Sequence, residues 1–77
     1  MSWNYRVIKT TEGSSSHYYL HEVYYDDAGQ PDGSTVEPVF VSGENVEEIR
    51  QVLTQMLRDI KQPVLEERDG KLIEVKA

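Results

Sequence analysis

The sequence predicts an α+β fold: a three-stranded antiparallel β-meander, one helix at about 46–61 packed on one face, and a C-terminal extended segment or hairpin. Three segments rich in aromatic and β-branched residues, separated by polar turns, predict the meander. One run with apolar residues at helical spacing predicts the helix. The 77 residues suffice for a single domain, 1–77, with one thin core.

The three expected strands follow one another closely along the chain. They cover residues 3–9, 17–25 and 35–41, and the second holds four of the five tyrosines. The polar stretches 10–16 and 26–34 join them and are rich in Gly, Asp, Ser or Pro, which favour turns. Short connections between consecutive strands favour antiparallel pairing.

The expected helix has clear signals at both ends. Asn45 is a suitable N-cap, and Glu48 lies three residues later, as in a capping box. Pro63 ends the helical pattern. The apolar residues of the helix recur at spacings of three and four: Val46, Ile49, Val52, Leu53, Met56, Leu57 and Ile60.

The C-terminal segment has a hairpin pattern. Residues 64–67 and 72–75 flank a turn centred on Asp69 and Gly70, and Asp-Gly is a two-residue hairpin signal. An isolated hairpin is marginal in water, so this one must pack against the rest of the chain. Otherwise residues 68–77 form a frayed tail.

The two faces of the expected sheet differ in polarity. Burying Glu22 without a partner is costly, so the helix is expected to cover Tyr19, Val23 and Tyr25, with Glu22 beside Arg6 on the open face. That open face is more apolar than a solvated face and is the candidate interaction surface. Three occupants remain open: the C-terminal tail, a second copy in a homodimer, or a partner protein. The surface comprises Arg6, Ile8, Leu20, Glu22 and Tyr24.

The composition argues against several classes of function. The formal net charge is −6 and the eight cations are scattered, which argues against direct binding to nucleic acid or to an anionic membrane. Cysteine is absent, which removes disulfides, thiol nucleophiles and zinc sites built with Cys. Residues 1–20 show no signal-peptide pattern, so a cytoplasmic location is expected.

The polar residues form no recognisable catalytic or metal motif. His17 and His21 would lie about 13 Å apart along a strand, too far to share a metal. The serines before His17 have no oxyanion-hole pattern, and residues 26–37 do not fit a calcium loop. His21, Glu22 and Asp26 are the only plausible acid–base set for an enzyme. No cofactor and no metal is expected.

Two strand motifs carry a resemblance to a known family. Residues 3–7 read Trp-Asn-Tyr-Arg-Val, and residues 21–26 read His-Glu-Val-Tyr-Tyr-Asp. With the acidic-capped helix and the Pro-Val-Leu at 63–65, they resemble a family of short, uncharacterised bacterial proteins. The resemblance covers about residues 3–65 and implies a bacterial origin, but no activity and no site residues.

Taken together, these features predict a small non-enzymatic protein-interaction module that binds a protein partner or a second copy of itself. The alternatives are a small enzyme that uses His21, Glu22 and Asp26, and an accessory protein of a nucleic-acid complex. A small domain without a pocket signature favours the first hypothesis.

Overall fold

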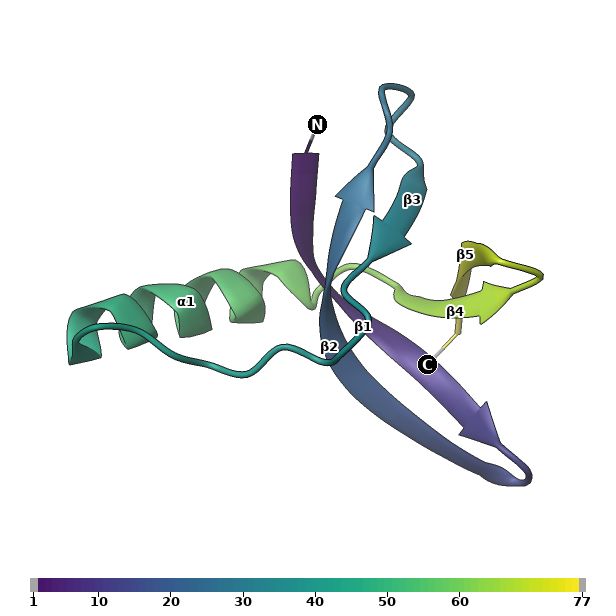
Figure 1. Ribbon diagram of the computed structural model, residues 1–77, viewed down its shortest axis with the longest axis horizontal. Coiled ribbons are helices and arrows are strands. Elements are labelled where there is room, and N and C mark those ends of the chain that lie inside the picture. The colour runs from purple at the N-terminus through teal and green to yellow at the C-terminus, as the bar shows by residue number, and fades with distance from the viewer. Residues whose placement is uncertain (1, 77) are drawn as a thin grey trace.

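A computed structural model describes residues 2–76 and shows one five-stranded sheet with one helix (Figure 1). The sheet order is β3-β2-β1-β4-β5, and the sheet curls into a half-barrel. β1 and β4 run parallel and the other neighbours antiparallel. The predicted three-stranded meander is therefore wrong, because the segment after the helix joins the same sheet.

The first two strands form a long hairpin that organises the fold. β1 (Ser2–Glu12) and β2 (Ser15–Tyr25) pair along their whole length, which confirms and extends both predicted strands. Only Gly13 and Ser14 separate them, and Gly13 has a φ of 61°. Glycine adopts this conformation without steric cost, so it allows the tight two-residue turn.

The third strand lies earlier in the chain than predicted. β3 (Pro31–Ser34) pairs with the end of β2, whereas residues 35–41 form no strand. The turn after β2 closes early, because the Asp26 amide donates to the Gln30 carbonyl at 2.9 Å. Residues 35–41 still follow β2 through isolated bonds: the Thr35 and Val39 amides donate to β2 carbonyls, and Thr35 also contacts the His21 ring and the Glu22 amide. Pro38, which has no amide hydrogen, interrupts any regular ladder.

The helix α1 (Val46–Asp59) begins where predicted and ends two residues earlier than the predicted 61. Oδ1 of Asn45 accepts from the Glu48 amide at 2.9 Å, which confirms the N-cap. The Glu48 carboxylate accepts from the Glu44 amide at 2.9 Å, one residue earlier than in a standard capping box. Ile60 is the C-cap. Within the described part of the chain, no helix is long and apolar enough to cross a membrane.

The C-terminal hairpin forms as predicted and lies against the first hairpin. β4 (Val64–Arg68) and β5 (Lys71–Val75) flank Asp69 and Gly70, whose φ angles of 53° and 78° suit a type I′ turn. β4 pairs with β1 at Ile8 and Lys9, and this parallel pairing makes the sheet mixed. Residues 68–75 of the expected frayed tail are thus paired or in the turn, and residue 77 lies outside the described residues.

The core lies on the concave side of the curled sheet. Ile8, Val23 and Leu65 are buried there, with Tyr25 and Leu72 packed against them. The helix covers the opposite face, where its Val52 lines a small hollow with Tyr5 and Glu22. The expectation that Val23 and Tyr25 lie under the helix is therefore wrong. Opposite residues of an antiparallel pair share a face, and Tyr5 is opposite Glu22, whereas Asn4 is opposite Val23.

Candidate functional site

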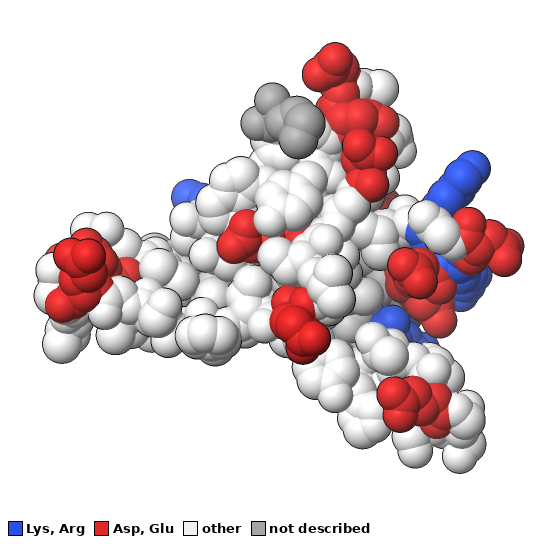
Figure 2. All heavy atoms as spheres, viewed as in Figure 1, with Lys and Arg blue, Asp and Glu red and all other residues white. Residues whose placement is uncertain are grey.

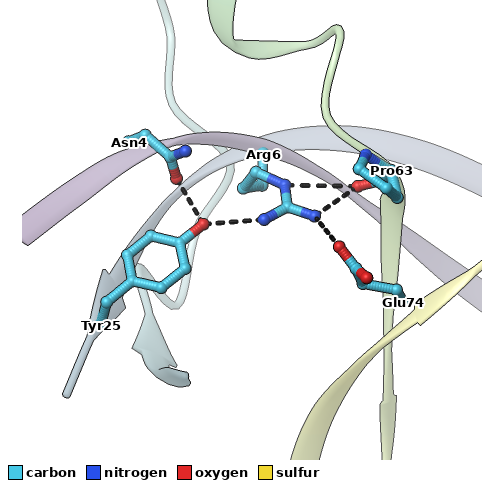
Figure 3. Close-up of polar contacts among 5 residues, drawn as sticks. All are labelled: Asn4, Arg6, Tyr25, Pro63 and Glu74. Atoms are coloured by element: carbon cyan, nitrogen blue, oxygen red, sulfur yellow. Dashed lines mark hydrogen bonds and ion pairs between the residues drawn. The ribbon is translucent and has the colours of Figure 1, made fainter. Parts of the chain in front are cut away.

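Arg6 is the most connected side chain of the concave side (Figure 3). It is only 4% exposed, although it is charged. Its Nη1 donates to the Tyr25 hydroxyl at 2.8 Å, and its Nε and Nη2 donate to the Pro63 carbonyl oxygen at 3.3 and 2.7 Å. Nη2 also lies 3.3 Å from Oε2 of Glu74. Arg6 thereby joins β1, β2, β5 and the connection after α1.

This network satisfies the buried guanidinium with mostly neutral acceptors. The Tyr25 hydroxyl, which accepts from Arg6, donates in turn to Oδ1 of Asn4 at 2.7 Å. Glu74 is the one carboxylate in the network and its side chain is exposed, so water screens that ion pair. The predicted cross-strand pair of Arg6 with Glu22 does not form, because His21 stands opposite Arg6. All three guanidinium nitrogens of Arg6 thus already have hydrogen-bond partners within the chain. An anionic ligand at Arg6 would have to displace Glu74.

An open hollow of about 880 Å³ lies on the concave side between β3 and the β4–β5 hairpin. His21 and Asp26 both line it. Nδ1 of His21 lies 3.0 Å from the Thr35 carbonyl oxygen. Oδ1 of Asp26 accepts from the Ala28 and Gln30 amides at 2.9 Å each, which makes Asp26 a turn residue.

The predicted acid–base set does not converge in this hollow. Glu22 is adjacent to His21 in β2, so its side chain points to the opposite face of the sheet. There Oε1 of Glu22 accepts a hydrogen bond of 3.0 Å from the Tyr24 hydroxyl, and this bond, together with burial and the Glu22 charge, raises the pKa of Tyr24. Among residues 2–76, no three His, Cys, Asp or Glu side chains are grouped to hold a metal ion.

The five residues of the predicted interaction surface lie on two different faces. Arg6 and Ile8 are buried on the concave side, and Ile8 belongs to the core. Leu20, Glu22 and Tyr24 are half-buried on the helix side. The structure therefore brings the last three together and separates them from the first two. Arg6 is opposite His21, one residue before Glu22, and neighbouring residues of a strand point to opposite faces, which accounts for this division.

A different apolar surface is exposed on the helix. Met56 is buried and Ile49 and Val52 are half-buried, so the sheet covers only part of the apolar face of α1. The remaining part is uncovered, and we call it the exposed stripe. It comprises Val46, Leu53, Leu57 and Ile60, which are 69%, 49%, 66% and 42% exposed. The sheet thus covers only three of the seven apolar residues that recur at helical spacing.

The shape of the molecule leaves the start of the stripe uncovered. The N-terminal part of α1 projects away from the sheet (Figure 1). Figure 2 shows acidic side chains at the free end of α1, at the tip between β2 and β3 and around the C-terminal hairpin, and a largely uncharged stretch along the helix. Phe40, in the segment before the helix, is also 83% exposed. Apart from Trp3, Tyr18 and Tyr19 on the strands, the exposed large apolar side chains of the described residues lie on α1 or in the segment before it.

Sequence reasoning missed two residues that position these elements. Neither Asp59, which is buried, nor Glu74, which contacts Arg6, was singled out from the sequence. Asp59 follows Val52 by seven residues and Met56 by three, so helical spacing places it on the packed side. That spacing is a signal that could have found it. The contact of Glu74 with Arg6 spans the whole chain and has no local signal.

Comparison with protein-family models, with curated proteins and with solved structures finds no match for this chain. The resemblance of residues 3–65 to a bacterial family therefore stays a prediction, and the case for function depends on the geometry described above.

Proposed function

We propose that this protein is a small non-enzymatic interaction module that binds a protein through the exposed stripe of α1. The observation that carries the proposal is the exposure of four large apolar side chains along one line of a well-capped helix. Large apolar groups that remain contiguous on a small protein mark a binding surface. An amphipathic helix with one apolar side free fits recognition of a helix or a groove.

Three observations favour this function over the alternatives. The candidate acid–base residues His21 and Glu22 point to opposite faces of β2. The guanidinium of Arg6 donates to Tyr25, Pro63 and Glu74, so its N–H groups are not free to bind a ligand as a set. The net charge of −6 disfavours an accessory role that requires contact with phosphates.

The experiment places a photo-crosslinking amino acid on the stripe, at position 57, in cells that express the protein. The matched control is position 51, which is also exposed and lies about 120° around the helix axis from position 57. We expect one recurring protein adduct from position 57 and none from position 51. Adducts from neither position, or equally from both, would show that the stripe is ordinary surface.

A further inference from the structure

We propose that the occupant of the exposed stripe is a second copy of this chain, whose α1 lies antiparallel to the first across a two-fold axis beside Leu53. This inference rests on the proposed function, because it identifies the protein that the stripe binds. It differs from the homodimer that the sequence left open as one of three possibilities, which used the open face of the sheet.

The spacing of the stripe is self-complementary. Val46, Leu53 and Ile60 are seven residues apart, or nearly two helical turns, so they lie along one line of α1. Leu53 is the midpoint of this line. A two-fold axis at Leu53 therefore brings Val46 of each copy against Ile60 of the other and the two Leu53 side chains together. An isologous contact of this kind requires one surface that matches itself.

The charges of the helix select the antiparallel direction. Glu44, Glu47 and Glu48 lie at its start, whereas Arg58 and Lys61 lie at its end. A parallel pair would align carboxylates with carboxylates along the two helices. The antiparallel pair places the acidic start of each helix beside the basic end of the other, with Glu48 level with Arg58, and it opposes the two helix dipoles.

The molecule as a whole exposes more surface than a compact monomer of its mass. The chain exposes 5780 Å². A compact monomer of its mass exposes about 4,800 Å². This excess of about 1,000 Å² belongs to all the projecting parts of the molecule together, and a standard interface would bury roughly 800 Å² of each partner. The radius of gyration is 13.2 Å. A compact domain of this length has about 11.5 Å.

The fold leaves room for the second helix. The half of α1 that contains Val46 projects beyond the sheet, with the segment before α1 running beside it (Figure 1), and Val46 is 69% exposed there. In the antiparallel arrangement, the projecting N-terminal end of each α1 lies beside the C-terminal end of the other copy's α1. A coiled-coil-like seam of this length buries the stripe on both sides.

The first test measures mass by light scattering and sedimentation over a range of protein concentrations. We expect a species of twice the 8.9 kDa monomer. Leu53→Glu should weaken it by about thirtyfold or more, as loss of an interface hot spot does. Gln51→Glu introduces the same charge off the stripe and should leave the dimer intact. A monomer at every concentration, or equal dissociation of both variants, would overturn the proposal.

A mixing experiment guards against a variant that fails simply because it misfolds. Leu53→Glu and Leu53→Lys, each monomeric alone, should associate when mixed, because position 53 faces itself across the axis. The direction is tested by cysteines, since the chain has none of its own. Val46→Cys and Ile60→Cys should form a disulfide with each other when mixed and not with themselves. Self-disulfides of Val46→Cys would indicate parallel helices and contradict the arrangement.

The two proposals fail in different ways. If position 57 crosslinks to another protein while the purified chain remains monomeric, the interaction function stands and the second copy is wrong. If position 57 yields no adduct at all and the chain remains monomeric, both are wrong.

Discussion

The backbone amide of Tyr5 donates a hydrogen bond of 3.1 Å to Oδ2 of Asp59, the last residue of α1. β1 pairs with β4 only at Ile8 and Lys9, so the edge of β1 near Tyr5 has no strand beside it. Oδ1 of Asp59 accepts from Nε of Arg58 at 3.2 Å. Both carboxylate oxygens are thus used, and one side chain both covers a strand edge and holds the helix to the sheet.

We expect Asp59→Ala to lower the free energy of unfolding by about 1–3 kcal/mol, because it leaves the buried Tyr5 amide without an acceptor. Urea unfolding followed by circular dichroism measures the loss. Asp59→Asn retains an amide oxygen that can accept from Tyr5, so it should lose less. Equal stability of wild type and Asp59→Ala would contradict the role of this bond.

We expect Arg6→Met to cost about 1.5–3 kcal/mol, because it removes charge-assisted hydrogen bonds: the Pro63 carbonyl loses two donors and the Tyr25 hydroxyl loses one. Glu74→Gln is the matched comparison. Because the Glu74 side chain is exposed, losing its charge should cost under about 1 kcal/mol. Thermal melts of the two variants show which substitution lowers the stability more. A larger loss for Glu74→Gln would show that the ion pair, not the neutral acceptors, stabilises the network.

Local rules predicted the turns and the start of the helix. The Asn45 cap and the Asp69-Gly70 turn depend on a few neighbouring residues, and both form as expected. The parallel pairing of β4 with β1 depends on contacts between distant parts of the chain. No periodicity within one segment encodes such a contact, so the five-stranded mixed sheet was predicted as a three-stranded meander.

The five residues predicted to form the candidate surface do not share one face, because Glu22 lies opposite Tyr5 rather than Arg6. Glu22 was predicted on the open face because burying it unpaired is costly. In the structure Glu22 is half-buried on the helix side, and the Tyr24 hydroxyl donates to it. Arg6 was expected on an open face, but it is buried and bonded to partners from distant segments. A sequence pattern predicts polar residues on the surface, and it does not show hydrogen-bond partners that come from distant segments of the chain.

We expect Asn45→Ala to cost about 1 kcal/mol, because the Glu48 amide loses its side-chain acceptor. The N-terminal part of α1 projects from the sheet, so fraying should remain local. Faster amide hydrogen exchange in the first helical turn, with unchanged exchange in β1 and β2, is the expected pattern. Gln51→Ala, on the exposed side of the same helix, serves as the control. Unchanged exchange at Glu48 in Asn45→Ala would contradict the cap.

The last prediction concerns alkaline pH. Burial, with the charges of Glu22 and Asp59, raises the pKa of Tyr5 above its ordinary value of 10.0. The hydrogen bond to Glu22, with burial and the Glu22 charge, likewise raises the pKa of Tyr24 above 10.0. The folded state therefore favours the neutral phenols. Their contribution to stability is complete below the unfolded-state pKa and is lost as the pH rises through the higher folded-state pKa.

Ultraviolet absorbance of tyrosinate measures this shift. The difference between the titrations of wild type and Tyr24→Phe isolates Tyr24, and its midpoint should lie above 10.0, the ordinary pKa of tyrosine. Glu22→Gln removes the charged acceptor, so in that background the Tyr24 midpoint should move down toward the ordinary value. A midpoint that does not respond to Glu22→Gln would show that the Tyr24 hydroxyl and Glu22 are not bonded in solution. The register that brings both to the helix side of β2 would then lose this support.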